Sequence, residues 1–332
     1  MSNIQCPVCS SPKSSVPVIT TSANEAAIHF VRNSGALDAT TLQEHIEKLW
    51  SSTECRILRC SECGSRYSDP HIAGDARFYD LASSPTGIYP QSRWEFDLTT
   101  RLVVEILKNG GQLLEVGGGS GAFVKQLIKK GLDANKIVVT EFSFSGLSEL
   151  MRIGVRVEEV DFRFGVNGGP FRVIVLFQTL EHLDRLDEVV DSLKKLGTAD
   201  AEVFISVPNV AYIDWAQENL GIIDMPPNHI NAFSEDGLRR LFLRHGCITT
   251  DLALHTRDSL AARSKFGAMR GLSYPSTRSQ KFLSNFFRMD SGHSSKIMLF
   301  LCAGLVLLTN WSLMRVVPPE NIWIRVKLDP NS

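Results

Sequence analysis

The chain has 332 residues, of which 43% are hydrophobic and 21% charged, and its formal net charge at pH 7 is −1. This composition is typical of a globular protein and excludes disorder, collagen-like repeats and a coiled coil. The near-zero net charge excludes a general attraction to nucleic acid, and the length favours two or three structural units.

Four of the seven cysteines form two pairs with the same spacing, Cys6 with Cys9 and Cys60 with Cys63. A two-residue spacer lets both sulfurs of a tight turn point at one centre, and two such turns supply four thiolates for a tetrahedral zinc ion. A redox pair or four unrelated thiols is the alternative. We predict a structural zinc site in a module spanning residues 1–70, where the metal would supply roughly 10 kcal/mol or more of folding free energy.

The remaining cysteines lack such spacing. Cys55 is a further candidate ligand, whereas Cys247 and Cys302 are expected to be buried apolar residues. Seven cysteines are too few for a disulfide scaffold, and residues 1–17 lack the apolar run of a signal peptide. We therefore expect a reducing, cytoplasmic location.

Apolar residues recur at helical spacing in two stretches between the cysteine pairs, 24–31 and 42–50, and predict two helices inserted in the zinc module. Residues 68–90 are rich in Pro, Ser, Gly and Asp. This composition is typical of a linker, which we place at 71–92.

The pattern changes from Arg93 onward. Helical spacing predicts a helix over 94–107, ended by Gly110 and Gly111. Short apolar runs then alternate with amphipathic stretches, which predicts an α/β fold with a parallel sheet covered on both faces. The predicted strands are 112–116, 136–141, 155–160, 171–177, 201–207, 248–254 and 321–328. The predicted helices between and after them are 121–130, 144–153, 184–197 and 234–245.

The strongest motif is the segment 113–121, Leu-Leu-Glu-Val-Gly-Gly-Gly-Ser-Gly. A buried strand ends there, glycines make the turn and a helix begins, so backbone N–H groups could approach a ligand closely. Read from Gly117 to Ala122, the loop also fits the looser dinucleotide fingerprint. Glu141 ends the next strand, where it would suit the ribose of either kind of adenosine ligand.

Glu115 distinguishes the two ligands, because Glu115, Gly117, Gly119 and Gly121 spell E-x-G-x-G-x-G. Three further segments follow in order: 177–183 (FQTLEHL), 201–209 (AEVFISVPN) and 229–238 (HINAFSEDGL). With these segments, residues 95–255 resemble the class I S-adenosylmethionine-dependent methyltransferases. The resemblance implies a Rossmann-like, seven-stranded, mostly parallel sheet with an antiparallel last strand at 320–328, preceded here by the small zinc-binding module. It places the S-adenosylmethionine-binding methyltransferase core at 93–255.

The resemblance also implies roles for single residues. Gly117, Gly119 and Gly121 would pack against the methionine portion of the cofactor, with Glu115 nearby and Gln178 facing it. Glu141 would accept hydrogen bonds from both ribose hydroxyls, because an ionised carboxylate only accepts. Asp161 would accept from the adenine amino group, and Phe142 or Phe162 would cover the ring. The alternatives are that Asp161 is a solvated turn residue and that Glu181 only orients a loop.

Methyl transfer from a sulfonium centre mainly requires alignment and exclusion of water. An acceptor hydroxyl or acidic C–H also needs a base, for which histidine is suited because its pKa lies near the working pH. His229 and His182 are the candidate catalytic residues, with Tyr212 as a weaker polar candidate. Histidines that only hydrogen-bond the backbone are the alternative.

A four-cysteine module in front of such a core resembles sugar C-methyltransferases and polysaccharide-associated methyltransferases. The resemblance implies a small-molecule acceptor, such as a nucleotide- or lipid-linked sugar, and no nucleic-acid partner. Two other functional classes stay open: an NAD(P)-dependent oxidoreductase, and a non-catalytic zinc adaptor with a relic cofactor fold.

The region 256–318 has a different composition. Residues 256–296 hold eight Lys or Arg against two Asp, and the next 18 residues, 297–314, carry no charge. That length is at the lower limit for a membrane span, and spanning would separate the last strand, in 319–332, from its sheet. We expect a buried helix, a lid over the active site, or a peripheral contact of 281–314 with the inner face of the membrane.

Overall fold

The computed structural model describes residues 5–12, 15–34, 39–82, 90–220, 225–255 and 318–328. They divide into two compact units, the first comprising 1–207, 225–253 and 322–332, and the second 208–224 and 254–321. The candidate cofactor residues, the two candidate histidines and the four paired cysteines all lie in the first unit. Residues 256–317, which include Cys302, the basic segment and the apolar stretch, lie outside the described residues.

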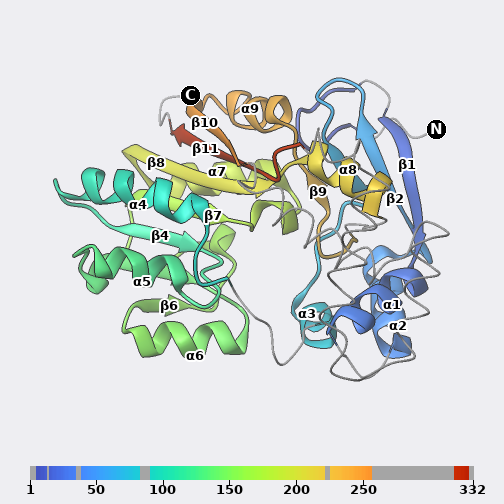
Figure 1. The fold of residues 1–332 in the computed structure, drawn as a ribbon, viewed down its shortest axis with the longest axis horizontal. Coiled ribbons are helices and arrows are strands. Elements are labelled where there is room, and N and C mark those ends of the chain that lie inside the picture. The colour runs from blue at the N-terminus through green and yellow to red at the C-terminus, as the bar shows by residue number, and fades with distance from the viewer. Residues whose placement is uncertain are drawn as a thin grey trace, which may run out of the picture. The chain divides into compact units, whose positions relative to one another are not determined.

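The first unit contains a seven-stranded sheet with the strand order β10-β11-β8-β7-β4-β5-β6, apart from a few terminal residues of β8, β10 and β11 (Figure 1). Its strands are β4 (Leu113–Val116), β5 (Ile137–Thr140), β6 (Arg156–Glu158), β7 (Phe171–Phe177), β8 (Gly197–Pro208), β10 (Ile248–His255) and β11 (Asn321–Lys327). The five strands from β4 to β8 pair in parallel. Six of the seven residues of β7 are buried, as expected for a central strand covered on both faces.

The last strand, β11, runs antiparallel to β8. The Leu328 N–H donates to the Ala201 carbonyl at one end of this pair, and the Asn209 N–H donates to the Glu320 carbonyl at the other. Residue numbers therefore rise along one strand as they fall along its neighbour. The predicted Rossmann-like, seven-stranded, mostly parallel sheet is confirmed.

Helices cover both faces of this sheet. Alternate residues of a strand point to opposite sides, so each face has its own apolar side chains for helices to pack against. Leu113 packs in one apolar cluster with α4, α5 and α6, whereas Leu114 packs in another with α7 and α9. The bounds of these helices are α4 (Trp94–Leu107), α5 (Ala122–Lys129), α6 (Phe144–Ile153), α7 (Leu186–Leu196) and α9 (Glu235–Leu243). Short 3₁₀ turns lie at η1 (Ala134–Lys136), η2 (Phe162–Phe164) and η3 (Leu180–His182).

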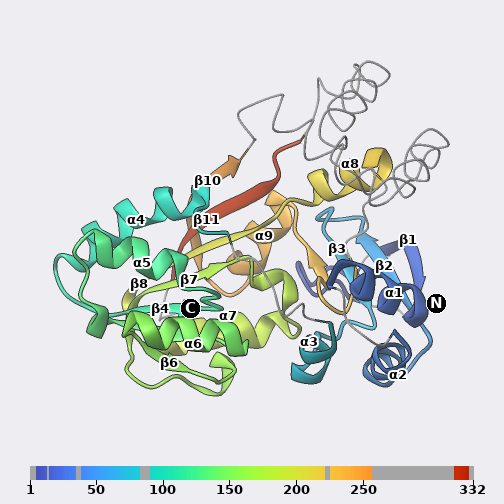
Figure 2. The same ribbon diagram turned by 60° about the horizontal axis from the view of Figure 1, so that its bottom comes forward.

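The N-terminal region forms a second, antiparallel sheet with the order β1-β2-β3-β9. Its strands are β1 (Ser15–Ser22), β2 (Glu54–Cys60), β3 (Arg66–Asp69) and β9 (Asn231–Ala232). Helices α1 (Ala23–Ser34) and α2 (Ala39–Trp50) match the two expected between the cysteine pairs, and they lie beside β1 and β2 (Figure 2). β9 follows β8 of the large sheet in sequence and pairs with β3. The second sheet therefore includes one strand from the part of the chain that forms the large sheet.

The stretch predicted to be a linker differs from that expectation. Within 71–92 the structure has a helix, α3 (Ala76–Ala82). Phe78 of α3 is 1% exposed and packs edge-on against Phe30 at 5.1 Å between ring centroids. One buried aromatic side chain thus fixes a segment whose composition is otherwise typical of a loop.

In the second unit the structure describes α8 (Val210–Leu220) and a few flanking residues. Tyr212, the weaker polar candidate, lies on α8, and its ring stacks on Trp215 with 5.8 Å between centroids. Across the described ranges, no helix has the length and apolar character that crossing a membrane requires.

Candidate functional site

The glycine loop after β4 has a backbone conformation that side chains disfavour. Gly117, Gly119 and Gly121 have φ angles of 75°, 52° and 68°, in the left-handed region. The N–H groups of Gly117 and Gly118 donate to the Thr140 carbonyl at 2.9 and 3.2 Å, which ties the end of β4 to the end of β5. A Cβ atom on Gly117 would lie 2.7 Å from Thr179 Oγ1. The loop therefore places bare main chain at the start of α5.

Glu141, at the end of β5, holds this loop. Its Oε2 accepts the Gly119 N–H at 2.6 Å, and its Oε1 accepts the N–H groups of Phe142 at 2.9 Å and Ser143 at 2.7 Å. A carboxylate offers about four acceptor positions, so three hydrogen bonds leave about one for a ligand. The residue predicted to bind a ribose is thus also the clamp of the glycine loop.

Glu115, on β4, lies beneath the loop rather than on its surface. It is 3% exposed, and no described residue donates a hydrogen bond to its Oε2. Burial, and secondarily the negative charge of Glu141, raise the pKa of Glu115 well above its ordinary value. The acidic residue of the E-x-G-x-G-x-G motif is therefore a buried carboxyl group.

Asp161 is engaged by a neighbouring cation. Arg163 donates to it through Nε and Nη2, at 2.9 and 2.6 Å to Oδ2, and donates through Nη1 to Asp184 Oδ1 at 2.8 Å. Such forked pairs are strong charge-assisted contacts. Any hydrogen bond that Asp161 accepts from an adenine amino group would share the carboxylate with Arg163.

The two aromatic candidates differ in exposure. Phe162 is 3% exposed and belongs to the apolar core, whereas Phe142, directly after Glu141, is 56% exposed. Phe142 is the one of the two with a ring face available to cover an adenine.

Gln178 directly follows β7 and has a φ angle of 53°, an uncommon value for a residue other than glycine. Its N–H donates to the Ser206 carbonyl at 2.8 Å and its Nε2 to Ser206 Oγ at 3.2 Å. Ser206 Oγ in turn donates to the buried Glu95 at 3.2 Å. The next residue, Thr179, donates to the Val116 carbonyl at 3.2 Å, so the ends of β4 and β7 meet beside the glycine loop.

The structure brings His182 and His229 together, with 4.5 Å between ring centroids. His182 Nδ1 lies 2.9 Å from the Asn228 carbonyl oxygen. A carbonyl only accepts, so Nδ1 carries the proton and Nε2 of the neutral ring holds the lone pair. Tyr79 Oη lies 3.4 Å from the same Nδ1. Burial raises the pKa of Tyr79, and the charge of Glu181 adds to this shift, so Tyr79 is a neutral phenol.

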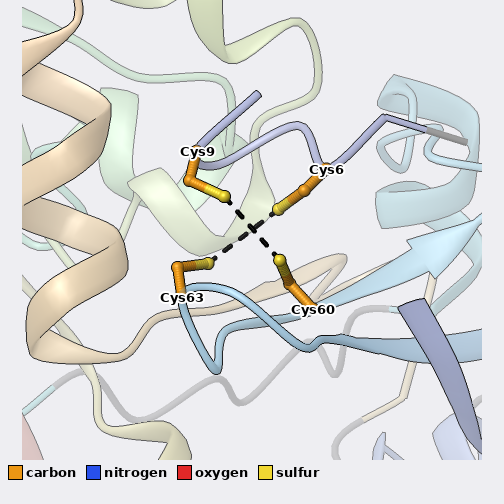
Figure 3. A group of neighbouring side chains, drawn as sticks. All are labelled: Cys6, Cys9, Cys60 and Cys63. Carbon is orange, nitrogen blue, oxygen red and sulfur yellow. Dashed lines mark hydrogen bonds between the residues drawn. The ribbon is translucent and has the colours of Figure 1, made fainter. Parts of the chain in front are cut away.

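The four paired cysteines converge from two turns (Figure 3). Cys6 Sγ lies 4.0 Å from Cys63 Sγ, and Cys9 Sγ lies 3.7 Å from Cys60 Sγ. Tetrahedral zinc with bonds of about 2.3 Å holds its sulfurs about 3.8 Å apart, so the donor set fits this ion. A hydrogen bond from the Cys6 thiol lowers the pKa of Cys63 to about 5, which supplies a thiolate at neutral pH.

Two other cysteines lie apart from this group. Cys55 packs in the apolar cluster with α1 and α2, and burial raises its pKa to about 12. Cys247 is fully buried in the core, as expected from its isolated position in the sequence.

The sequence was compared with models of known protein families. Residues 91–251 match a family model described as a methyltransferase domain. The predicted enzyme class, a S-adenosylmethionine-dependent methyltransferase, is thereby confirmed. No curated protein gives a significant match.

Solved structures of methyltransferases are also similar to the chain. A SAM-dependent methyltransferase from Archaeoglobus fulgidus is 14% identical with a TM-score of 0.45, and the match covers 70% of this chain and 94% of that one. Geranyl diphosphate C-methyltransferase from Streptomyces coelicolor A3(2), solved with S-adenosyl-L-homocysteine, is 10% identical with a TM-score of 0.43. That match covers 70% of this chain and 75% of the other.

The cysteine turns are fastened to the methyltransferase domain. Ser234, which caps α9, donates through Oγ to the Cys63 carbonyl. Arg244 donates to the carbonyls of Pro7 at 3.0 Å and Val8 at 3.3 Å. The Ser68 N–H donates to the Ile230 carbonyl at 2.9 Å, next to His229. The cysteine module therefore supports the loop that carries one candidate catalytic residue.

Sequence reasoning missed four residues of this site. Tyr79 contacts His182, and Ser206 contacts Gln178. Glu95 in turn contacts Ser206, and Thr179 contacts Val116. These partners are distant in sequence, so no local pattern marks the four residues. Asp161 differs, because the Asp-Phe-Arg order at 161–163 is a local signal for its pairing with Arg163.

Proposed function

We propose that the methyltransferase domain transfers the methyl group of S-adenosylmethionine to a small-molecule acceptor at the carboxyl edge of its parallel sheet. One observation carries this proposal: Glu141 clamps the glycine loop, and Thr179, which follows the strained residue Gln178 after β7, donates to Val116 at the start of that loop. Ligands of open α/β sheets bind at this edge, where loops from neighbouring strands converge.

The residues at this edge fit the parts of the cofactor. Main chain at Gly117, Gly119 and Gly121 is bare enough to pack against the methionine portion, and Gln178 flanks the same place. Glu141 has about one acceptor position left for a ribose hydroxyl. Phe142 offers an exposed ring for the adenine, and Asp161 would share its carboxylate between Arg163 and the adenine amino group. Glu115 would place a buried carboxyl group beneath the loop.

When bound, S-adenosylmethionine supplies a methyl group activated by its sulfonium sulfur. The chain's own residues align the acceptor with that methyl and remove the acceptor's proton. We assign this removal to the His182–His229 pair, with His229 as the general base predicted from the sequence. His182 is oriented beside it by the Asn228 carbonyl, which fixes its tautomer.

The acceptor that we propose is a sugar, carried on a nucleotide or a lipid. Support comes from the combination of a four-cysteine module with this domain and from the contacts that fasten Cys63, Pro7 and Val8 to α9. Cys6, Cys9, Cys60 and Cys63 would hold a structural zinc ion, and the ion would keep this support folded.

The test is turnover of S-adenosylmethionine by the full chain with a panel of nucleotide-linked sugars, measured as formation of S-adenosylhomocysteine. We expect acceptor-dependent turnover. We also expect His229→Gln to keep cofactor binding and to lower kcat by about 100-fold or more, the usual contribution of a positioned base. Full kcat in His229→Gln would show that the base is another group. Absence of turnover with every sugar class would exclude the sugar acceptor.

A further inference from the structure

Glu181, His182 and His229 form a group that the mechanism uses only in part. One potential ligand atom from each residue lies within 4.8 Å of the others. Glu181 and His182 belong to η3, directly after β7, and His229 precedes β9. The Ile230 N–H donates to the Glu181 carbonyl at 3.0 Å, so the backbone holds the two segments side by side.

The tautomer of His182 suits a metal ligand. Its Nδ1–H donates to the Asn228 carbonyl at 2.9 Å, which leaves the lone pair on Nε2. Metal-ligating histidines commonly donate their other N–H to a carbonyl or carboxylate in this way, which fixes the ring and raises the basicity of the ligating nitrogen. His182 therefore has a supporting contact of the kind that metal sites use.

Burial and charge favour a cation here. Glu181 is 1% exposed, and the hydroxyl of Tyr79 lies 3.4 Å from His182 Nδ1. A buried carboxylate is stable when hydrogen-bond donors or a cation surround it. A divalent ion bound by Glu181 and the two imidazoles would neutralise this charge.

We propose that Glu181, His182 and His229 bind a divalent transition-metal ion, at a site separate from the four cysteines. Two imidazoles and one carboxylate suit Zn²⁺, Mn²⁺ or Fe²⁺ and leave coordination positions open. Bonds of about 2.1 Å place ligand atoms about 3 to 3.5 Å apart, so small side-chain rotations would close the group around an ion.

The place of this metal site in the fold indicates which ligand its open coordination positions would bind. This inference about the ligand rests on the proposed function. Thr179, two residues before Glu181, donates to the carbonyl of Val116 at 3.2 Å, directly before Gly117 of the glycine loop. An acceptor hydroxyl bound to the ion would be near the methyl donor, and the ion would lower its pKa so that it gives its proton to solvent water. His229 then acts as a ligand, and the general-base role applies to the metal-free protein, since a ligated nitrogen holds no lone pair for a proton.

The experiment is equilibrium dialysis of the full chain against Mn²⁺ alone, with bound metal quantified and its nitrogen ligands detected by pulsed electron paramagnetic resonance. Mn²⁺ is chosen because it prefers oxygen and nitrogen to thiolate, so the four-cysteine cluster does not compete. We expect about one Mn²⁺ per chain with imidazole nitrogen couplings. Glu181→Gln and His182→Ala should each weaken binding by about tenfold or more.

The matched control is His245→Ala. His245 also has nearby carboxylates, Asp187 and Asp191, but they lie on the exposed surface, and its loss should leave Mn²⁺ binding unchanged. Thermal unfolding checks that each variant is folded. Binding without nitrogen couplings, equal binding in Glu181→Gln, or no binding above the level of a surface site overturns the proposal.

Failure of this proposal and failure of the proposed function give different results. Sugar-dependent turnover by protein that binds no Mn²⁺ would remove the metal site and keep the function. Mn²⁺ binding lost in Glu181→Gln, together with no turnover on any acceptor, would keep the site and remove the function.

Discussion

The Glu141 carboxylate accepts the backbone N–H of Gly119 at 2.6 Å, across a separation of 22 residues in the sequence. The side chain proposed to bind the ribose and the main chain proposed to bind the methionine portion are therefore one hydrogen-bonded unit. A change at Glu141 should alter both parts of the cofactor site together.

Glu141→Gln should weaken S-adenosylmethionine binding by about 10-fold to 100-fold, because a hydrogen bond to a charged group contributes about 1.5–3 kcal/mol. Glutamine has an NH₂ group, which donates, in place of one carboxylate oxygen. It therefore cannot accept hydrogen bonds at both positions where Glu141 Oε1 and Oε2 accept them. The dissociation constant from calorimetry checks this. Glu105→Gln is the control, since Glu105 is 72% exposed on α4 and pairs with Lys108, and it should leave the constant unchanged.

Gly117→Ala should abolish cofactor binding, whereas Gly131→Ala should not. Both glycines have a positive φ, 75° and 91°, so alanine strains either backbone by about 1–2 kcal/mol. A Cβ on Gly117 would meet Thr179 Oγ1 at 2.7 Å, but a Cβ on Gly131 would meet open space. We expect the two variants to lose similar amounts of melting temperature. Only Gly131→Ala should still bind the cofactor. Equal binding in the two variants would show that the loop does not contact the cofactor.

Cys63→Ser should remove the zinc ion and lower the melting temperature, because three thiolates hold zinc less tightly than four. Cys55→Ser provides the comparison, since Cys55 is equally buried but lies among apolar side chains. We expect it to cost some stability and to leave the zinc content unchanged. Metal content per chain decides this, and a loss of zinc in Cys55→Ser would show that Cys55 is a ligand.

Glu115 should make stability depend on pH in a direction unusual for an acidic residue. Burial raises its pKa in the folded chain above the ordinary value of 4.5, so the folded state binds its proton more tightly than the unfolded state. Its contribution is complete below that ordinary value and is lost as the pH rises through the folded-state pKa. Glu115→Gln carries no ionisable group and lacks this loss.

The free energy of unfolding of both proteins in urea, measured at about pH 5 and about pH 8, tests this. The variant should gain stability relative to the unmodified chain at the higher pH. If the free energies of unfolding of the two proteins differ by the same amount at both pH values, the pKa of Glu115 is not raised by folding.

The elements that the sequence predicts well are those whose apolar pattern is local. The run 171–177 is apolar at all but one position, and it forms β7 over those same residues. The two-residue strand β9 has no such pattern, because it exists only through its pairing with Tyr67 and Arg66 of β3. Helix α3 was missed for a related reason, since Phe78 gains its stability from packing against Phe30 rather than from helical periodicity.

The candidate site divides in the same way. The glycines and Glu141 follow strands at fixed spacing, so the sequence indicates them together with their place at the sheet edge. Contacts such as Tyr79 with His182 join residues 103 positions apart and depend on how α3 packs. Glu115 was expected near the cofactor's methionine portion, but its burial beneath the loop depends on the side chains of β5 and α6, which no short motif specifies.

Calorimetric titration of the full chain with S-adenosylmethionine, and separately with NAD, tests the central claim most directly. We expect saturable binding of S-adenosylmethionine, weakened in Glu141→Gln, and no binding of NAD. Binding of NAD in place of the methyl donor, or heat from neither ligand, would contradict a S-adenosylmethionine site between the glycine loop and Glu141.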